Sequence, residues 1–492
     1  MTFGLDVGSQ HLSAAWVGPG GSPQLIADKT DPDLFVTPAV VGLEGNRAYV
    51  GRSAEVFAED NPLAAVARSL KSSLGSGEVL LRDARGRGWF AETLLTPLLT
   101  KVLDDAALAA GTRPAHAVIN VPREFGAPQR QAVLRAADWA GLASAVLLDR
   151  SVAAARFLAG GLDSSGNDLA LVFSVGSRFA EATVVEIGPR SLAVRGAAHA
   201  RVGSRALDEA VWQALRPVVG EAVDDPAAQA QALPAVSRWR QKFSRPGTRE
   251  AETVLFLRGK PHVLHLTATQ HEQIGAPLVA QLMELAQAAL QQAGIGWDRI
   301  AQVWPVGAGA QEPTVLAALA ALAGKTVTPR MALQAPAFGA ALHAADLHGS
   351  TPWLGLPTRA GRPDSGVALR LLGADQKPTY DTLIAAGSAL PARATRQFTT
   401  ARAEQVRMVF DLVFLNGSNA ETAGLFAFGP IAKPRAGLVV ELQVALSAEG
   451  VLSAEATEGV GGPRLARTLL VRGGSSEPLV AQRTLLEGIR HA

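Results

Sequence analysis

A strand-turn-strand motif occurs twice in the chain, and this repeat constrains the fold more than any other feature. "FGLDVGSQHLSAAWV" runs from Phe3 to Val17, and "LVFSVGSRFAEATVV" runs from Leu171 to Val185. Each copy is an apolar strand, the letters V-G-S, four variable residues, an alanine and a second apolar stretch. A glycine at such a turn lets backbone N–H groups approach a phosphate, because it has no Cβ. The repeat therefore predicts two related lobes that clamp one phosphate chain, with a pair of ordinary structural hairpins as the alternative.

The composition is that of a globular protein, with 48% hydrophobic and 18% charged residues. The 46 basic and 44 acidic residues leave a net charge of only +2, which is no footprint of a nucleic-acid-binding protein. The sequence contains no uninterrupted apolar run of membrane-spanning length and no signal peptide. It also contains no cysteine, which excludes disulfides and thiol catalysis and suits a reducing compartment. We expect a cytoplasmic protein with neither a nucleic-acid nor a membrane partner.

Patterning divides the chain into four parts. Residues 1–347 alternate short apolar strands with Ala-rich helical stretches, which predicts an α/β domain. Residues 348–366 concentrate Gly, Pro and Ser and are typical of a linker. Residues 367–472 show strands broken by turn residues and no long helical pattern, which predicts an antiparallel β-sandwich. Residues 473–492 form a short tail with room for one short helix at most.

The order of these segments resembles that of the DnaK-type seventy-kilodalton heat-shock chaperones, over nearly the whole chain up to about residue 472. The most specific motif is "INVPREFGAPQRQAVLRAADWAGL", Ile119 to Leu142, which is close to the family pattern V-P-x-x-F-x-x-x-Q-R-Q-A followed by A-G-L. "PVGAGAQEP", Pro305 to Pro313, resembles the adenosine loop, and "TLIAAGSALPA", Thr382 to Ala392, resembles a segment of the family's sandwich. The resemblance implies a duplicated actin-like ATPase domain followed by a peptide-binding type of β-sandwich. We do not expect the family's helical lid, because only 20 residues of the sequence follow the predicted sandwich.

The resemblance also implies ATP or ADP as the ligand, with or without Mg²⁺. Asp6 and Ser9 would suit contact with Mg²⁺ through water and with phosphate. Lys71, four residues before Gly75, matches the family's phosphate-contacting lysine, and Arg240 matches a lysine of the adenine-facing helix; for both, a surface charge is the alternative. The candidate nucleotide-binding residues are Asp6, Gly8, Ser9, Gln10, Lys71, Gly176, Ser177, Arg240, Ser244, Gly307 and Gly309.

Three catalytic positions of the family are changed here. Ser174 stands in place of the second acid, Phe179 in place of a hydroxyl residue, and Arg150 in place of the acid beside the attacking water. A guanidinium cannot accept a proton at neutral pH, so Arg150 cannot replace that acid. Arg150 and Arg178 could pair with phosphate, and pairing with neighbouring acids is the alternative. We expect at most slow ATP hydrolysis and favour a pseudo-ATPase.

The resemblance further implies coupling and peptide-binding residues. Pro122 and Arg130 match the proline and arginine that relay nucleotide state to the peptide domain, whereas Val146 replaces an arginine that meets a J-domain partner. A standard J-domain cycle is therefore not expected. The expected partner is an extended apolar polypeptide segment, held by backbone hydrogen bonds and a hydrophobic pocket. The candidate pocket residues, for which a place in the sandwich core is the alternative, are Leu372, Phe398, Ala401 and Met408.

Three functions stay open on the sequence. The first is a chaperone-like protein that binds nucleotide and extended apolar segments, and Gly8, Ser9 and Lys71 favour it. The second is a nucleotide-independent scaffold or regulatory interaction protein, which Arg178 and Phe179 favour. The third, an actin-like sugar or acetate kinase, shares the repeat but does not account for the sandwich. We take the first as the working hypothesis.

Overall fold

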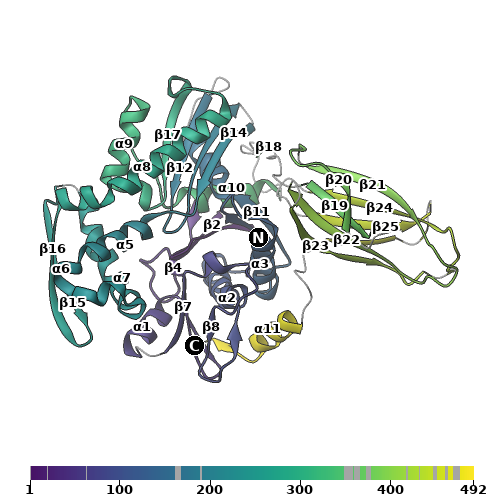
Figure 1. The fold of residues 1–492 in the computed structure, drawn as a ribbon, viewed down its shortest axis with the longest axis horizontal. Coiled ribbons are helices and arrows are strands. Elements are labelled where there is room, and N and C mark those ends of the chain that lie inside the picture. Colours follow the sequence, from purple (N-terminus) through teal and green to yellow (C-terminus); the bar gives the residue numbers. More distant parts are fainter. Residues whose placement is uncertain are drawn as a thin grey trace.

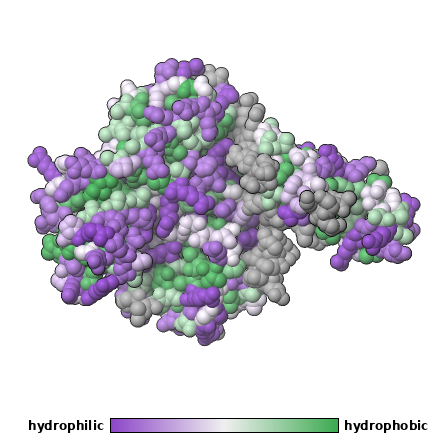
Figure 2. Space-filling model, in the orientation of Figure 1, coloured by the Kyte–Doolittle hydropathy of each residue, from purple (hydrophilic) through white to green (hydrophobic). Residues whose placement is uncertain are grey.

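The computed structural model describes residues 2–18, 20–61, 64–160, 168–188, 191–245, 247–347, 358–359, 366–372, 378–389, 391–416, 419–431, 433–446, 452–459, 462, 464–468 and 477–491. Figure 1 shows an α/β body with a β-sandwich that projects from one side of it. On the face drawn in Figure 2, hydrophilic and hydrophobic residues are interspersed. No helix in the described part of the chain combines the length and apolar character needed to cross a membrane.

The α/β body contains two mixed sheets with the same strand pattern, which confirms the predicted duplicated fold. The orders are β11-β10-β1-β2-β3, with β4 also paired to β2, and β17-β12-β13-β14-β18. In both sheets an antiparallel hairpin, β1–β2 or β12–β13, continues into a parallel pair, β1–β10 or β12–β17. The strands of the first sheet are β1 (Thr2–Val7), β2 (His11–Val17), β3 (Pro23–Leu25), β4 (Thr37–Pro38), β10 (His116–Val121) and β11 (Ser144–Asp149). Those of the second are β12 (Asp168–Val175), β13 (Ala180–Gly188), β14 (Ser191–Ala200), β17 (Ile300–Val306) and β18 (Thr358–Arg359).

The two V-G-S turns have the same hydrogen-bonded geometry. The Gly8 N–H donates to the His11 carbonyl at 2.9 Å, and the Gly176 N–H donates to the Phe179 carbonyl at 2.9 Å. The repeat seen in the sequence is therefore also a repeat of backbone conformation.

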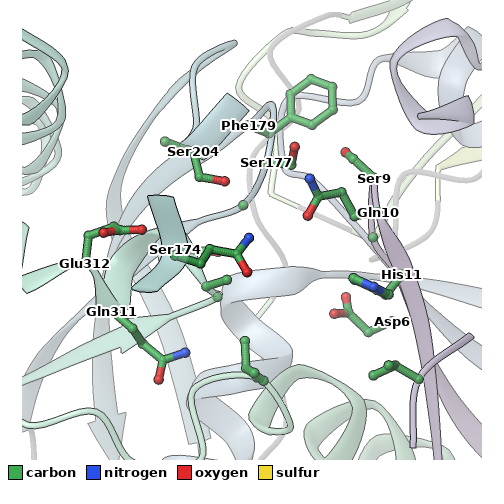
Figure 3. Close-up of a pocket in the computed structure, with 18 of the residues that line it drawn as sticks. Asp6, Ser9, Gln10, His11, Ser174, Ser177, Phe179, Ser204, Gln311 and Glu312 are labelled. Atoms are coloured by element: carbon green, nitrogen blue, oxygen red, sulfur yellow. The ribbon is translucent and has the colours of Figure 1, made fainter. Parts of the chain in front are cut away.

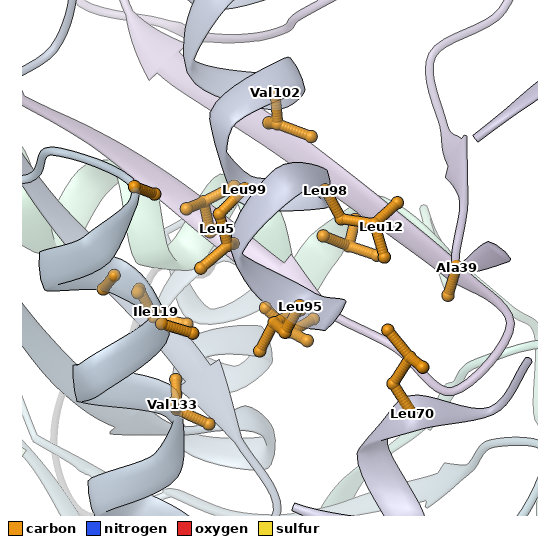
Figure 4. Packing of buried hydrophobic residues seen from close by; sticks show 14 of the residues in the cluster. Leu5, Leu12, Ala39, Leu70, Leu95, Leu98, Leu99, Val102, Ile119 and Val133 are labelled. Carbon is orange, nitrogen blue, oxygen red and sulfur yellow. The ribbon is translucent and has the colours of Figure 1, made fainter. Parts of the chain in front are cut away.

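Helix α2 (Ala91–Ala110) covers one face of the first sheet. Figure 4 shows Leu95, Leu98 and Leu99 of this helix packed near Leu5 and Leu12 of the strands. All five side chains are at most 2% exposed. Since full burial of one such side chain contributes roughly 1.5–3 kcal/mol, this contact is a major source of stability for the first lobe.

Helix α10 (Ala335–Leu347) packs against both β1 and α4 (Arg150–Ala159), and small residues allow a very close approach. A Cβ on Gly4 would lie 2.1 Å from the Ala341 nitrogen, and a Cβ on Gly339 would lie 1.7 Å from the Ala153 carbonyl oxygen. Both positions therefore require glycine. This packing sets the distance between β1, which carries Asp6, and α4, which carries Arg150.

The remaining helices surround these sheets, and three smaller sheets complete the body. The helices are α1 (Arg52–Asp60), α3 (Ala127–Trp139), α5 (Ser204–Ala214), α6 (Arg216–Val219), α7 (Pro226–Arg240), α8 (Ala268–Ala293) and α9 (Pro313–Ala323). The smaller sheets contain β5 (Val40–Glu44), β6 (Arg47–Val50) and β7 (Ala65–Arg68), then β8 (Leu81–Arg82) and β9 (Gly88–Trp89), then β15 (Glu250–Leu257) and β16 (Lys260–Thr267).

The sandwich consists of two antiparallel sheets of four strands each, as the sequence predicts. The orders are β20-β19-β22-β23 and β21-β24-β25-β26. Alternate residues of β24, Val440, Leu442 and Val444, are at most 1% exposed, which is the period of two expected for a strand with one face in a core. The strands are β19 (Gly366–Leu372), β20 (Pro378–Ile384), β21 (Ala392–Thr399), β22 (Met408–Asn416), β23 (Asn419–Phe428), β24 (Val439–Leu446), β25 (Leu452–Glu458) and β26 (Arg464–Thr468). Most of the predicted linker, 348–357 and 360–365, lies outside the described residues, so the domain boundaries stay predictions.

The C-terminal tail returns from the sandwich to the first lobe. Helix α11 (Glu477–Glu487) contacts α2, and β27 (Arg490–His491) pairs in parallel with β6. Leu485 and Ile489 pack against the core of this lobe. The tail helix therefore lies on the body of the protein, far along the chain from the residues that it touches. Residues 473–476 lie outside the described part.

Candidate functional site

A cavity of about 720 Å³ lies between the two V-G-S turns, within the usual 300–1,000 Å³ of small-molecule sites. Figure 3 shows Asp6, Ser9, Gln10 and His11 on one side of it, and Ser174, Ser177, Ser204 and Glu312 on the other. The candidate nucleotide-binding residues that line it are Asp6, Gly8, Ser9, Gln10, Lys71, Gly176, Ser177, Arg240, Ser244 and Gly307. The structure thus gathers residues from both copies of the repeat around one space.

Arg150, the first residue of α4, joins the two copies at the floor of the cavity. Its Nε donates to Asp6 Oδ1 at 3.0 Å and Oδ2 at 3.2 Å, and its Nη2 donates to Asp6 Oδ2 at 3.1 Å. Its Nη1 donates to Ser174 Oγ at 2.9 Å. Burial would lower the pKa of Arg150, but the charge and hydrogen bonds of Asp6 together with the charge of Glu181 raise that pKa, so the guanidinium is charged.

Lys71 is buried beside this pair and is not a surface charge. It lies at the 3-10 turn η1 (Leu70–Ser73), is 6% exposed, and its Nζ donates to the Val7 carbonyl at 2.6 Å. Burial lowers its pKa to about 8, with Asp6 partly opposing the shift and Arg150 adding to it. Lys71 and Arg150 therefore bring two cationic groups to the end of the cavity where Asp6, the carboxylate of the first V-G-S copy, lies.

Phe179 packs against a neighbouring ring at the same end of the cavity. Its ring meets Phe125 edge to face, with centroids 6.1 Å apart, and Lys71 Nζ lies 5.9 Å from the Phe125 centroid. The side chain that replaces the family's hydroxyl thus contributes an apolar wall and no hydrogen-bond donor.

Each carboxylate that lines the cavity has at least one partner in the protein, while Oε2 of Glu312 has none among the described residues. Asp6 is held by Arg150, and Glu312 accepts from Arg240. Glu181 accepts from the backbone N–H groups of Ser151 and Arg123, both at 3.3 Å. Among the described residues, no three His, Asp or Glu side chains gather as ligands for a metal ion. Asp6, the carboxylate expected to contact a hydrated Mg²⁺, is held by the Arg150 guanidinium, so this arrangement does not fit the metal that the resemblance implies.

Arg240 is neither a surface charge nor an uncommitted ligand. It is 1% exposed, its Nε donates to Asp208 Oδ1 at 2.7 Å, and its Nη1 contacts Glu312 Oε1. Burial would lower the pKa of Arg240, but its two carboxylate partners together raise it. Burial, with a smaller effect of Arg240, lowers the pKa of the adjacent His271 to about 4, so this histidine is neutral at pH 7.

The two predicted glycines of the adenosine loop have different roles. Gly307 lines the cavity at φ +85°, and a Cβ there would lie 2.5 Å from the Val175 carbonyl oxygen. A side chain at this position would therefore enter the second turn. Gly309 is not among the described residues that line the cavity; a Cβ there would lie 2.6 Å from a Val175 methyl carbon, so packing against β12 accounts for this glycine.

Several lining residues were missed by the sequence reasoning. Four of them, Arg238, Gln241, Lys242 and Arg245, lie where α7 passes into the 3-10 turn η3 (Gln241–Ser244), beside the predicted Arg240 and Ser244. The others include His11, Glu181, Ser204 and Glu312, which come from other elements. The run of basic residues in "RWRQKFSR" was the available signal. Arg178, in contrast, is not among the described lining residues.

The predicted coupling residues lie next to this site. Pro122 lines the cavity, and Arg130 Nη2 donates to Asp149 Oδ1 at 2.8 Å. Arg123 Nη1 donates to Asp149 Oδ2 at 3.0 Å. Burial would raise the pKa of Asp149, but the two arginines lower it. Since Asp149 directly precedes Arg150, the predicted coupling residue Arg130 touches the same stretch of chain that carries the central guanidinium.

The predicted peptide contacts lie in different environments within the sandwich. Met408 is 8% exposed and belongs to the core, Phe398 packs on Phe410 with centroids 5.1 Å apart, and Ala401 is exposed. The side chain of Leu372 lies outside the described residues. Their role in peptide binding stays a prediction.

Comparison with known proteins gives the same relationship along almost the whole chain. A family model described as Hsp70 protein matches residues 75–464. Chaperone protein DnaK of Thermus thermophilus is 28% identical over 537 aligned residues, covering 99% of this chain and 83% of the relative. Chaperone protein DnaK of Deinococcus deserti is 26% identical over 500 residues, covering 93% of this chain and 77% of the relative. Chaperone protein DnaK of Deinococcus radiodurans is 26% identical over 509 residues, covering 95% and 78%.

Proposed function

Because the chain belongs to the Hsp70 protein family, we propose that it is a chaperone-related protein that binds ATP or ADP between its lobes and hydrolyses ATP slowly or not at all. The observation that carries the proposal is the cavity itself, where both V-G-S turns converge with Lys71 and Gly307. Its basic lining and glycine turns suit a polyphosphate, because cationic side chains and exposed amides both favour anionic oxygen. We further propose the division into residues 1–347, 348–366, 367–472 and 473–492.

Slow hydrolysis follows from what stands at the catalytic positions. Phosphoryl transfer depends on groups that hold metal, orient the attacking water and stabilise charge. Here Ser174 offers no carboxylate, and Arg150 is fixed on Asp6 and cannot accept a proton. Loss of one such group commonly costs a factor of ~10² to 10³ in rate, so the combined changes predict turnover near the limit of detection.

The sandwich is proposed to bind extended apolar polypeptide segments. Support comes from the relatives' name as chaperones and from the two four-stranded sheets, whose outer strands offer backbone hydrogen-bonding groups to an added segment. Binding of this kind gives affinity through the backbone and selectivity through side-chain pockets.

A nucleotide-independent scaffold is the second candidate, and one observation favours it. Arg150 links the two copies of the repeat without any ligand, through its ion pair with Asp6 and its hydrogen bond to Ser174. Such a link would keep the lobes together in a protein that has no nucleotide to bind.

Calorimetric titration of the full-length protein with ATP and with ADP, both in the presence of Mg²⁺, separates the two candidates. We expect saturable heats with one site per chain, and weaker binding by Lys71→Ala. Absence of heat with either nucleotide would reject nucleotide binding and favour the scaffold. A parallel assay of phosphate release should detect little or no turnover. Mg²⁺-dependent turnover that Lys71→Ala abolishes would contradict the proposed loss of hydrolysis.

A further inference from the structure

The position of Arg150 bears on which form of nucleotide this site takes. Its guanidinium donates to the carboxylate of Asp6, the group expected to contact a hydrated Mg²⁺. The same guanidinium also donates, through Nη1, to the hydroxyl of Ser174 in the second copy. We infer that the Arg150 guanidinium takes the place of the divalent cation, so that the cavity binds the free polyphosphate of a nucleotide and does not require Mg²⁺. This inference rests on the proposed nucleotide binding.

The geometry of the fork leaves donors for a ligand. A guanidinium has five N–H bonds. The contacts to Asp6 and Ser174 use Nε and one N–H on each terminal nitrogen. The second N–H on Nη1 and on Nη2 is then available to phosphate oxygens. Nη1 also lies 3.5 Å from the position that a Cβ on Gly307 would occupy, which places it beside the glycine turn of the adenosine loop.

The charges around the fork also disfavour a metal ion. Asp6 already has a cationic partner, and Lys71 brings a second positive group to the same end of the cavity. A divalent cation would have to displace Arg150 from Asp6, or lie beside two groups of its own charge. The other two lining carboxylates also have partners in the protein: Glu181 accepts from two backbone N–H groups, and Oε1 of Glu312 pairs with Arg240. A polyphosphate has no such conflict, because arginine forms strong charge-assisted hydrogen bonds to phosphate.

The test is calorimetric titration of the full-length protein with ADP and ATP, in buffer with Mg²⁺ and in buffer with EDTA. We expect binding in both buffers, with dissociation constants that differ by less than about tenfold. If the site required a metal ion to neutralise the phosphate charge, removing the metal would weaken binding by more than this factor. Binding seen with Mg²⁺ and lost, or weakened by more than about tenfold, in EDTA would overturn the inference and leave nucleotide binding intact. Absence of binding in both buffers would reject the proposed function as well.

A charge-reversing substitution adds a second, independent readout. Arg150→Glu places a second carboxylate beside Asp6 and should make nucleotide binding depend on Mg²⁺, with weak binding in EDTA that Mg²⁺ restores. Arg150→Lys, which keeps the charge, should retain binding in EDTA. Arg238→Glu makes the same change of charge at an exposed lining residue and should alter affinity equally in both buffers. Thermal unfolding of each variant reports whether it folds, and the wild-type comparison stands if Arg150→Glu does not.

Discussion

Replacing Gln482 with alanine should release the C-terminal tail from the first lobe. This side chain is 5% exposed, and each of its polar atoms is used. Its Oε1 accepts from the Phe90 N–H at 3.1 Å and from Thr93 Oγ1 at 2.7 Å, and its Nε2 donates to the Gly88 carbonyl at 2.7 Å. The three partners belong to the start of α2 and the strand before it, so one amide fixes α11 on a site about four hundred residues earlier in the chain.

The size of the effect follows from these three hydrogen bonds. At ~1 kcal/mol for each bond, their loss destabilises the docked tail by roughly 3 kcal/mol. A change of that size lowers the ratio of docked to undocked tail by about a hundredfold. The loss of global stability cannot exceed the free energy of docking the tail, because in the undocked state water can reach the Phe90 N–H, the Thr93 hydroxyl and the Gly88 carbonyl. The substitution should therefore act on the tail without unfolding the lobe beneath it.

Hydrogen–deuterium exchange is the suitable assay, because it reports local opening as well as global unfolding. Peptides from α11 should exchange much faster in Gln482→Ala than in wild type, and peptides from β1 and β10 should be unchanged. Arg483→Ala is the matched control, since Arg483 is the next residue of the helix and its side chain is 65% exposed. Wild-type protection of α11 in Gln482→Ala would refute the argument that this amide holds the tail.

Three further predictions concern other parts of the chain. Burial lowers the pKa of Lys71 from 10.5 to about 8. Between these pH values the unfolded chain holds a proton that the folded chain has lost, so the free energy of unfolding should rise with pH. Urea unfolding at several pH values should show this slope in wild type and not in Lys71→Met. Arg240→Ala leaves two buried carboxylates without their cation and should cost ~3–5 kcal/mol in urea unfolding, whereas Arg238→Ala, at an exposed neighbour, should cost less than ~0.5 kcal/mol. A fluorescently labelled Leu-rich peptide should bind the full-length protein and dissociate quickly. Phe398→Asp should abolish the rise in the peptide's anisotropy, while the circular dichroism of the protein stays the same. Unchanged binding would show that Phe398 is not part of the peptide site.

The fold was predictable where the signal is local. Each V-G-S turn needs only a glycine between two apolar strands, and the structure gives both turns the same hydrogen bond from Gly8 and from Gly176. The sandwich followed from alternation and turn residues, which are also local properties. Family resemblance supplied the ligand class, and the cavity brings together residues that the motifs had named separately, such as Ser9 and Ser244.

The contacts that decide the chemistry of the site were not predictable, because their partners are remote in sequence. Arg240 was read as a surface charge or a ligand, and nothing in its surroundings along the chain identified Asp208 and Glu312 as its partners. Gln482 has the polarity of a surface residue, and only the folded chain shows which groups it satisfies. Buried charged and amide groups need partners, yet a single sequence does not say which of many candidates provides them.

The site and the predicted relay meet at one junction, where β11 ends and α4 begins. Asp149 is held by Arg123 and Arg130, and the next residue, Arg150, is held by Asp6 and Ser174. A ligand that drew the guanidinium toward phosphate would act on the residue next to Asp149, whose side chain is held by the predicted coupling residue Arg130 and by Arg123. Coupling between two sites requires an element whose arrangement both of them bias, and we expect this junction to be that element. We therefore expect Arg150 to be the group through which a polyphosphate would reach the predicted coupling residues, a role that a carboxylate at the same position could exert only through a bound cation.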